Sequence, residues 1–143
     1  MGIARGSAAF AMFAGLALAL AAPASAAAPL SGHYTETETY PDGRTVHTDW
    51  YFNPCGDGCA AVTGTPDGKP WGQAQIVNGQ WTIDGAGGVD CEQGGDVPNA
   101  IKYHYSWDPN TLAGTVQITN NVQACGNPAG YQETNQMQLT QAP

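Results

Sequence analysis

The stretch at residues 101–118, IKYHYSWDPNTLAGTVQI, decides the fold. It consists of two segments in which apolar and polar residues alternate, separated by DPNT at 108–111. Such alternation is typical of β-strands with one buried face, and a proline between Asp and Asn favours a turn. We predict a hairpin in which Trp107 pairs with Leu112. One face of this hairpin then carries Ile101, Tyr103, Tyr105, Gly114, Val116 and Ile118.

Other parts of the chain repeat this pattern around other turn sequences. Alternating segments at 32–41 and 44–53 flank Pro-Asp-Gly, and the segment 71–84 contains Asn-Gly, a strong hairpin signal. A last strand is expected at 131–140. Residues 85–99 lack apolar periodicity and are predicted to form a long loop.

The registers implied by these turns keep apolar side chains on one face. Placing Tyr34 opposite Trp50 satisfies the first turn, and Phe52 opposite Val62 continues the same face. We therefore predict an all-β fold without a helix after residue 26. It is a small antiparallel meander of about eight strands, closed as an up-and-down barrel, with a two-sheet β-sandwich as the alternative.

The first 26 residues are predicted to be a signal peptide. They combine Arg5, an apolar run at 10–22 and the small residues Ala24-Ser25-Ala26. The run is shorter than the roughly 20 residues of a membrane-spanning helix. Cleavage near Ala26 would leave one secreted domain, 27–143, outside the cell or associated with its envelope, with no transmembrane anchor.

Acidic residues dominate the composition. The chain has 12 Asp and Glu against 4 Lys and Arg, a net charge of −8, and removal of Arg5 with the signal peptide would make it −9. No basic cluster exists that could attract phosphate groups. Nucleic acids and anionic membranes are therefore not expected as partners.

All four cysteines lie after residue 26. An even count in an exported domain favours two disulfides, and zinc is disfavoured because no CxxC motif is present. Four cysteines allow three connectivities. The turn at 55–59 favours Cys55 with Cys59, which leaves Cys91 with Cys125.

Three short sequences carry a resemblance to known proteins. They are PCGDGC at 54–59, WDPNTLAGTV at 107–116 and CGNPAG at 125–130, behind an alanine-rich leader. The chain resembles the small exported proteins of mycobacteria and their relatives. The resemblance implies export and two disulfides, and it implies no activity and no site residues.

Glu36 and Glu38 share one face of the first strand. Two carboxyl groups can hydrolyse glycosides if the surroundings keep one of them protonated. Their threonine neighbours favour a solvated strand end instead. If a closed barrel holds both residues inside its mouth, the pair would favour a cationic ligand.

Metal sites are not expected. The loop residues Asp90, Glu92 and Asp96 are a weak calcium candidate, but their spacing fits no EF-hand and acidic loops are usually solvated. The three histidines, His33, His47 and His104, could bind a transition metal only if two hairpins brought them together. We predict that they face solvent, and no cofactor is expected.

The aromatic residues favour binding rather than catalysis. Trp71 is expected outward or at a rim, on the face of Gln73 and Gln75, where it could stack on a sugar or a peptide. Tyr103 and Tyr105 would face a ligand if the barrel is hollow. Neither serine after residue 26 lies in a nucleophile motif, and disulfide formation would leave no cysteine nucleophile.

The expected function is a secreted, monomeric, non-catalytic binding module for a small apolar or carbohydrate ligand of the cell envelope or a host. Its expected binding residues are Trp71, Tyr103, Tyr105, Glu36 and Glu38. An extracellular interaction protein without a small-molecule pocket is the alternative. A hydrolase that uses the two glutamates is the least favoured function.

Overall fold

The computed structural model describes residues 27–143. The predicted signal peptide and its cleavage site lie outside the described residues. Within 27–143, no helix has the length and hydrophobicity that crossing a membrane requires.

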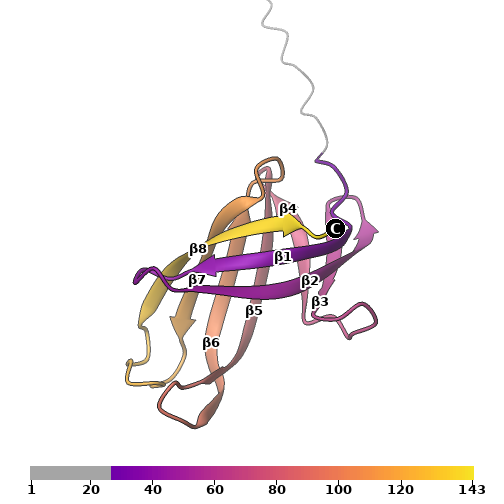
Figure 1. Ribbon diagram of the computed structural model, residues 1–143. Coiled ribbons are helices and arrows are strands. Elements are labelled where there is room, and N and C mark those ends of the chain that lie inside the picture. Colours follow the sequence, from indigo (N-terminus) through magenta and orange to yellow (C-terminus); the bar gives the residue numbers. More distant parts are fainter. Residues whose placement is uncertain (1–26) are drawn as a thin grey trace, which may run out of the picture.

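Eight antiparallel strands follow one another in sequence order and close into a barrel (Figure 1). The strands are β1 (Gly32–Thr39), β2 (Thr45–Gly56), β3 (Cys59–Thr63), β4 (Gly72–Val77), β5 (Gln80–Asp90), β6 (Asp96–Trp107), β7 (Ala113–Asn120) and β8 (Gln132–Gln141). Strand β1 pairs with β2 on one side and with β8 on the other, which closes the sheet. The predicted all-β barrel is confirmed, and the alternative of a sandwich is wrong.

The tight turns set the registers as predicted. Tyr34 pairs with Trp50 across β1 and β2, and Phe52 pairs with Val62 across β2 and β3. The Asn-Gly turn between β4 and β5 has positive φ at both residues, 50° at Asn78 and 79° at Gly79. This is the conformation that a two-residue hairpin with right-handed strand twist requires.

The register of the β6–β7 hairpin differs from the prediction by two residues. Trp107 pairs with Gly114 rather than with Leu112. The Asp108 carboxylate accepts hydrogen bonds from the amides of Asn110 and Thr111, at 2.7 and 2.9 Å, and Leu112 adopts a φ of +59°. Leu112 therefore belongs to the turn and not to the following strand. The shift by two residues leaves the same side chains of each strand facing inward.

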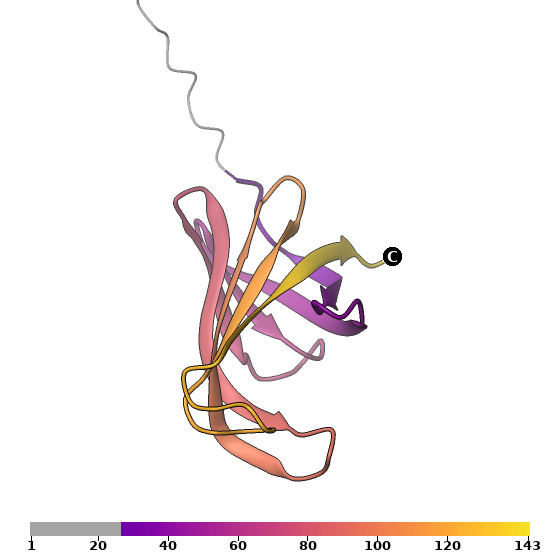
Figure 2. The same cartoon turned by 90° about the vertical axis from the view of Figure 1, so that its left-hand side faces the viewer.

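The predicted long loop at 85–99 is wrong for most of its length. Strands β5 and β6 extend through it and leave only residues 91–95 between them. Glycine is needed at position 85 because a Cβ atom there would lie 2.3 Å from the Tyr103 hydroxyl oxygen. The glycine-rich strand thus makes room for a large ring inside the barrel. Figures 1 and 2 show this hairpin reaching beyond its neighbours.

One end of the barrel is filled with apolar side chains. This filled end contains the turns between β2 and β3, β4 and β5, and β6 and β7, and Leu30 is buried in the same cluster. The core cluster comprises Leu30, Tyr34, Trp50, Phe52, Ala60, Val62, Ala74, Trp81, Ile83, Trp107, Met137 and Leu139. The opposite end, here called the mouth, is bordered by the connections between β1 and β2, β3 and β4, β5 and β6, and β7 and β8.

Both predicted disulfides are confirmed. Cys55 is bonded to Cys59 beside the turn that joins β2 to β3. Cys91 is bonded to Cys125, which links the β5–β6 loop to the β7–β8 connection at the mouth. The described residues contain no free cysteine.

The longer bridge should contribute more to stability. In the loop-entropy model, the Cys91–Cys125 bridge closes a loop of about 35 residues and contributes about 4 kcal/mol. The Cys55–Cys59 bridge closes about five residues and contributes about 2 kcal/mol. We expect replacement of Cys91 and Cys125 by alanine to lower the free energy of unfolding, measured by urea titration, about twice as much as replacement of Cys55 and Cys59. A larger loss for the shorter bridge would contradict the entropic account.

Candidate ligand site in the barrel mouth

The inward face of the barrel changes character along β1. Tyr34 lies in the apolar core, whereas Glu36 and Glu38, the next two inward positions, carry carboxyl groups. Strand β8 shows the same change, from buried Met137 to buried Asn135. Side chains two residues apart in a strand share a face, so the closed sheet gathers these polar groups inside the barrel near its mouth.

A cavity of about 240 Å³ lies at this point of the interior. Its lining residues are Glu36, Glu38, Thr48, Trp50, Trp71, Tyr103 and Tyr105. We call it the acidic cavity. All five residues that the sequence suggested for ligand binding line it, although they come from β1, from β6 and from the segment before β4.

An aromatic wall forms one side of the acidic cavity. The centre of the Trp50 ring is 5.1 Å from that of Trp71 and 5.1 Å from that of Tyr105. Tyr103 lies 5.6 Å from Tyr105 and 6.2 Å from Trp71, again edge to face. These contacts fix the orientation of the rings, because edge-to-face pairs are favoured by the ring quadrupoles.

Trp71 lies at the rim and turns over Trp50. Its backbone N–H donates a hydrogen bond to the Val62 carbonyl oxygen at 3.0 Å, which holds it just before β4. The expected strand face shared with Gln73 and Gln75 is wrong, because β4 begins only at Gly72. The side chain remains 38% exposed, whereas Trp50 beneath it is only 2% exposed.

Glu36 is buried in the structure, so the expected solvated strand end is wrong for this residue. It is 2% exposed, and its Oε1 atom has no hydrogen-bond partner among the described residues. Burial in a poorly solvated site, with a smaller contribution from Glu38, raises the pKa of Glu36 from 4.5 to about 8. This carboxyl group is therefore mostly protonated at neutral pH.

Glu38 has a hydrogen-bond donor that Glu36 lacks. The Asn135 side-chain amide donates to Glu38 Oε1 at 2.5 Å. Burial raises the pKa of Glu38, while the hydrogen bond from Asn135 opposes that shift. Asn135 itself is fully buried, and its Oδ1 atom has no partner among residues 27–143.

The two glutamates bear on glycoside hydrolysis. Glu36 could act as the protonated acid, and the reaction also needs an ionised carboxylate as nucleophile or base. Burial raises the pKa of Glu38, whereas the hydrogen bond from Asn135 lowers it. Glu38 is the one other carboxyl group among the residues that line the acidic cavity, so it would have to take the second role.

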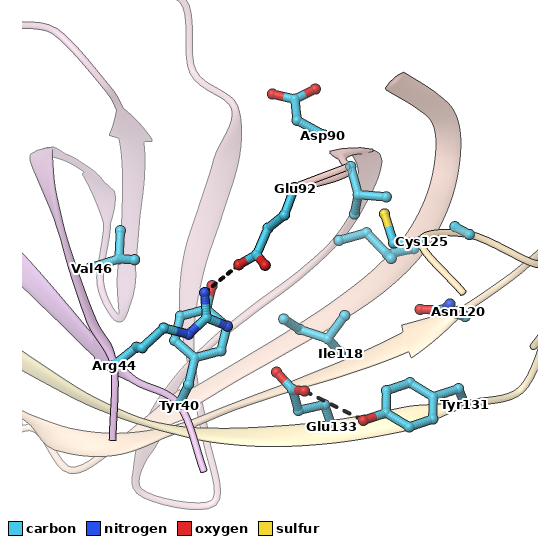
Figure 3. A pocket seen from close by; sticks show the side chains of 13 residues that line it. Tyr40, Arg44, Val46, Asp90, Glu92, Ile118, Asn120, Cys125, Tyr131 and Glu133 are labelled. Atoms are coloured by element: carbon cyan, nitrogen blue, oxygen red, sulfur yellow. Dashed lines mark hydrogen bonds and ion pairs between the residues drawn. The ribbon is translucent and has the colours of Figure 1, made fainter. Parts of the chain in front are cut away.

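A second cavity of about 440 Å³ lies nearer the rim (Figure 3). The two are neighbours because Ile101, which lines the larger one, is two residues from Tyr103 on the same face of β6. Its apolar lining residues include Val46, Val89, Ile101 and Ile118. Arg44 crosses the opening and pairs with both Asp42 and Glu92, and its guanidinium lies 5.1 Å above the Tyr40 ring.

Two residues of this region, one lining the acidic cavity and one behind it, were not identified as site residues from the sequence. The alternation in the second strand placed Trp50 inward, but this residue was assigned to the core alone. Asn135 lies two residues before Met137 in β8, so the same alternation could have placed it inward. Its contact with Glu38 depends on the closure of the barrel, which brings the last strand beside the first.

The histidines and loop carboxylates that were weak metal candidates do not come together into a metal site in the described residues. Each histidine pairs with a different neighbour: His33 with Asp49 at 2.9 Å, His47 with Thr37 at 3.0 Å and His104 with Asp84 at 2.6 Å. In the calcium candidate, Glu92 pairs with Arg44, while Asp90 lies opposite Asp96. No three His, Cys, Asp or Glu side chains in the described part of the chain form a group that could hold a metal ion.

Known proteins offer no further guide to the site. No family model, no curated protein and no solved structure matches this chain.

The buried carboxyl of Glu36 should make stability depend on pH. Between pH 4.5 and 8 the folded state keeps a proton at Glu36 that the unfolded state has lost, so stability falls as pH rises, by up to about 1.4 kcal/mol per pH unit. We expect the melting temperature of Glu36→Gln to match that of the unsubstituted protein near pH 4 and to exceed it increasingly up to pH 8.

The control for this comparison is Asp67→Asn, which replaces an exposed carboxyl group by its amide. Its melting temperature should follow that of the unsubstituted protein at a constant offset. Parallel curves for Glu36→Gln as well would show that Glu36 is solvated.

Proposed function

We propose that this protein is a non-catalytic binding module that takes a small ligand into the mouth of its barrel. The observation that carries the proposal is the convergence of aromatic rings and carboxyl groups inside the mouth. Cavities of about 440 and 240 Å³ occupy the mouth, and another of about 490 Å³ lies at the opposite end beside the turn between β2 and β3. The two cavities of the mouth have a combined size that is typical of small-molecule sites.

The lining supports a ligand with an apolar or ring-shaped body. Aliphatic side chains line the larger cavity, and Trp71 presents a partly exposed ring at the rim of the smaller one. Burial of an alkyl or ring surface here would contribute about 25 cal/mol for each Å² removed from water. A sugar could instead stack on Trp71 and hydrogen-bond to the two glutamates.

Export is part of the proposal. The two disulfides fit an oxidising, extracellular compartment. We propose that a signal peptide at 1–26 directs the chain there, and that the ligand comes from the cell envelope or from a host. The acidic composition supports a ligand other than a nucleic acid or an anionic membrane.

A simple pair of probes tests ligand binding. We expect isothermal titration calorimetry to detect binding of 1-octanol or octyl glucoside to the domain 27–143. Replacement of Trp71 by alanine should weaken binding about tenfold, because it removes one of the four rings of the aromatic wall that the ligand would contact. Because the side chain is partly exposed, the same change should lower the free energy of unfolding by only about 1–2 kcal/mol.

The matched control is Trp71→Phe, which keeps a ring at the rim and should retain most of the affinity. Comparison of the two probes separates the ligand classes, since tighter binding of octyl glucoside than of 1-octanol would favour a carbohydrate. Release of glucose that Glu36→Gln abolishes would instead establish a hydrolase and overturn the proposal.

A further inference from the structure

The acidic cavity contains carboxyl groups without a cation. Among the described residues that line it, two are glutamates and none is basic. Arg44, which stands at the mouth, is engaged by Asp42 and Glu92 instead. The cavity therefore holds two carboxyl groups and no positive charge to neutralise them. Burial makes the ionised form of such a carboxyl group unfavourable.

One buried polar atom of the acidic cavity lacks a partner. Glu36 lines the cavity and is 2% exposed, and its Oε1 atom has no hydrogen-bond partner among residues 27–143. Buried polar atoms are almost always satisfied in native proteins, and this oxygen indicates that a partner is supplied from outside the chain. Asn135 Oδ1 also has no partner among the described residues, but Asn135 does not line the cavity and its amide group already serves Glu38.

The aromatic wall favours the same kind of group. Trp50, Trp71, Tyr103 and Tyr105 surround the cavity from strands β2 and β6 and from the rim. Aromatic faces carry negative electrostatic potential and attract a cation within about 6 Å of the ring centre, and this attraction is stronger when the site is desolvated. A donor that is also a cation satisfies both the carboxyl groups and the rings.

We propose that the acidic cavity binds an ammonium group that carries N–H donors, and that the ligand is a small amphiphilic amine. The inference rests on the proposed binding function and names the chemical class of its ligand. The ammonium donates hydrogen bonds to Glu36 and Glu38 beside the aromatic wall. The apolar tail lies in the adjoining larger cavity against aliphatic side chains such as Ile101 and Ile118.

Binding is coupled to a proton. Glu36 is mostly protonated at pH 7 because its pKa is about 8, and an adjacent ammonium favours its ionised form. The ionisable groups around it are Glu38 from the same strand and the phenols of Tyr40, Tyr103 and Tyr105, whose pKa values are raised by burial. Capture of an ammonium at pH 7 therefore releases a proton, and affinity rises from pH 6 to pH 9.

Probes that share one tail test the charge. We expect octylammonium, an amine that stays charged throughout this range, to bind at pH 7.5 about tenfold more tightly than 1-octanol, because charge-assisted hydrogen bonds replace neutral ones. Titrations in buffers of different ionisation enthalpy should show release of up to one proton at pH 7. Glu36→Gln should abolish this release and bring the two affinities within a factor of about three.

The matched control is Asp67→Asn, which replaces an exposed carboxyl group that lines neither cavity of the mouth and should keep both the preference and the proton release. Equal binding of octylammonium and 1-octanol would overturn the ammonium assignment while leaving the binding module in place. Tighter binding of octyltrimethylammonium, which has no N–H group, would also overturn it. Failure of all these probes and of octyl glucoside to bind would overturn the proposed function itself.

Discussion

The pairing of β1 with β8 is the constraint on which the rest of the structure depends. Six residue pairs join these strands, from Tyr34 opposite Gln141 to Thr39 opposite Gln136. Closure removes the exposed edges that an open meander would have. It also gives the sheet an inside, so that alternate residues of every strand face one another across a confined space. Both the apolar core and the polar cavities are consequences of that confinement.

The same closure explains why a glutamate becomes buried. On an isolated hairpin, Glu36 would stand opposite Thr48 with water on its side of the sheet. In the barrel, Leu139 of β8 lies beside it and the rings of the aromatic wall cover the space in front. The resulting desolvation is expensive for the free protein. Such a cost is common at functional sites, where a ligand relieves it.

Features set by local chemistry could be predicted from the sequence. The turns after Tyr40 and Val77 fixed their registers because Pro-Asp-Gly and Asn-Gly allow few backbone conformations. The β6–β7 register was missed because Leu112 takes a left-handed conformation that side chains rarely adopt. The extension of β5 was missed because its glycine at position 85 leaves space for the Tyr103 ring, which lies on another strand.

The candidate site shows the same division. Period-two alternation put Glu36, Tyr103 and Tyr105 on inward faces, which requires only knowledge of each strand. Whether those faces enclose a cavity depends on how eight strands tilt and how large the side chains of the filled end are. The partnership of Asn135 with Glu38 joins residues 97 positions apart. No local pattern could reveal it.

The bond between Cys91 and Cys125 gives the mouth a further property. Cys125 lines the larger cavity, and its partner belongs to the loop at the far tip of the β5–β6 hairpin. That hairpin reaches beyond its neighbours (Figure 2). The covalent bond at its tip ties it to the β7–β8 connection, which restricts the relative motion of these two segments. The outline of this side of the mouth is therefore set by the oxidation of two thiols as well as by the pairing of the strands.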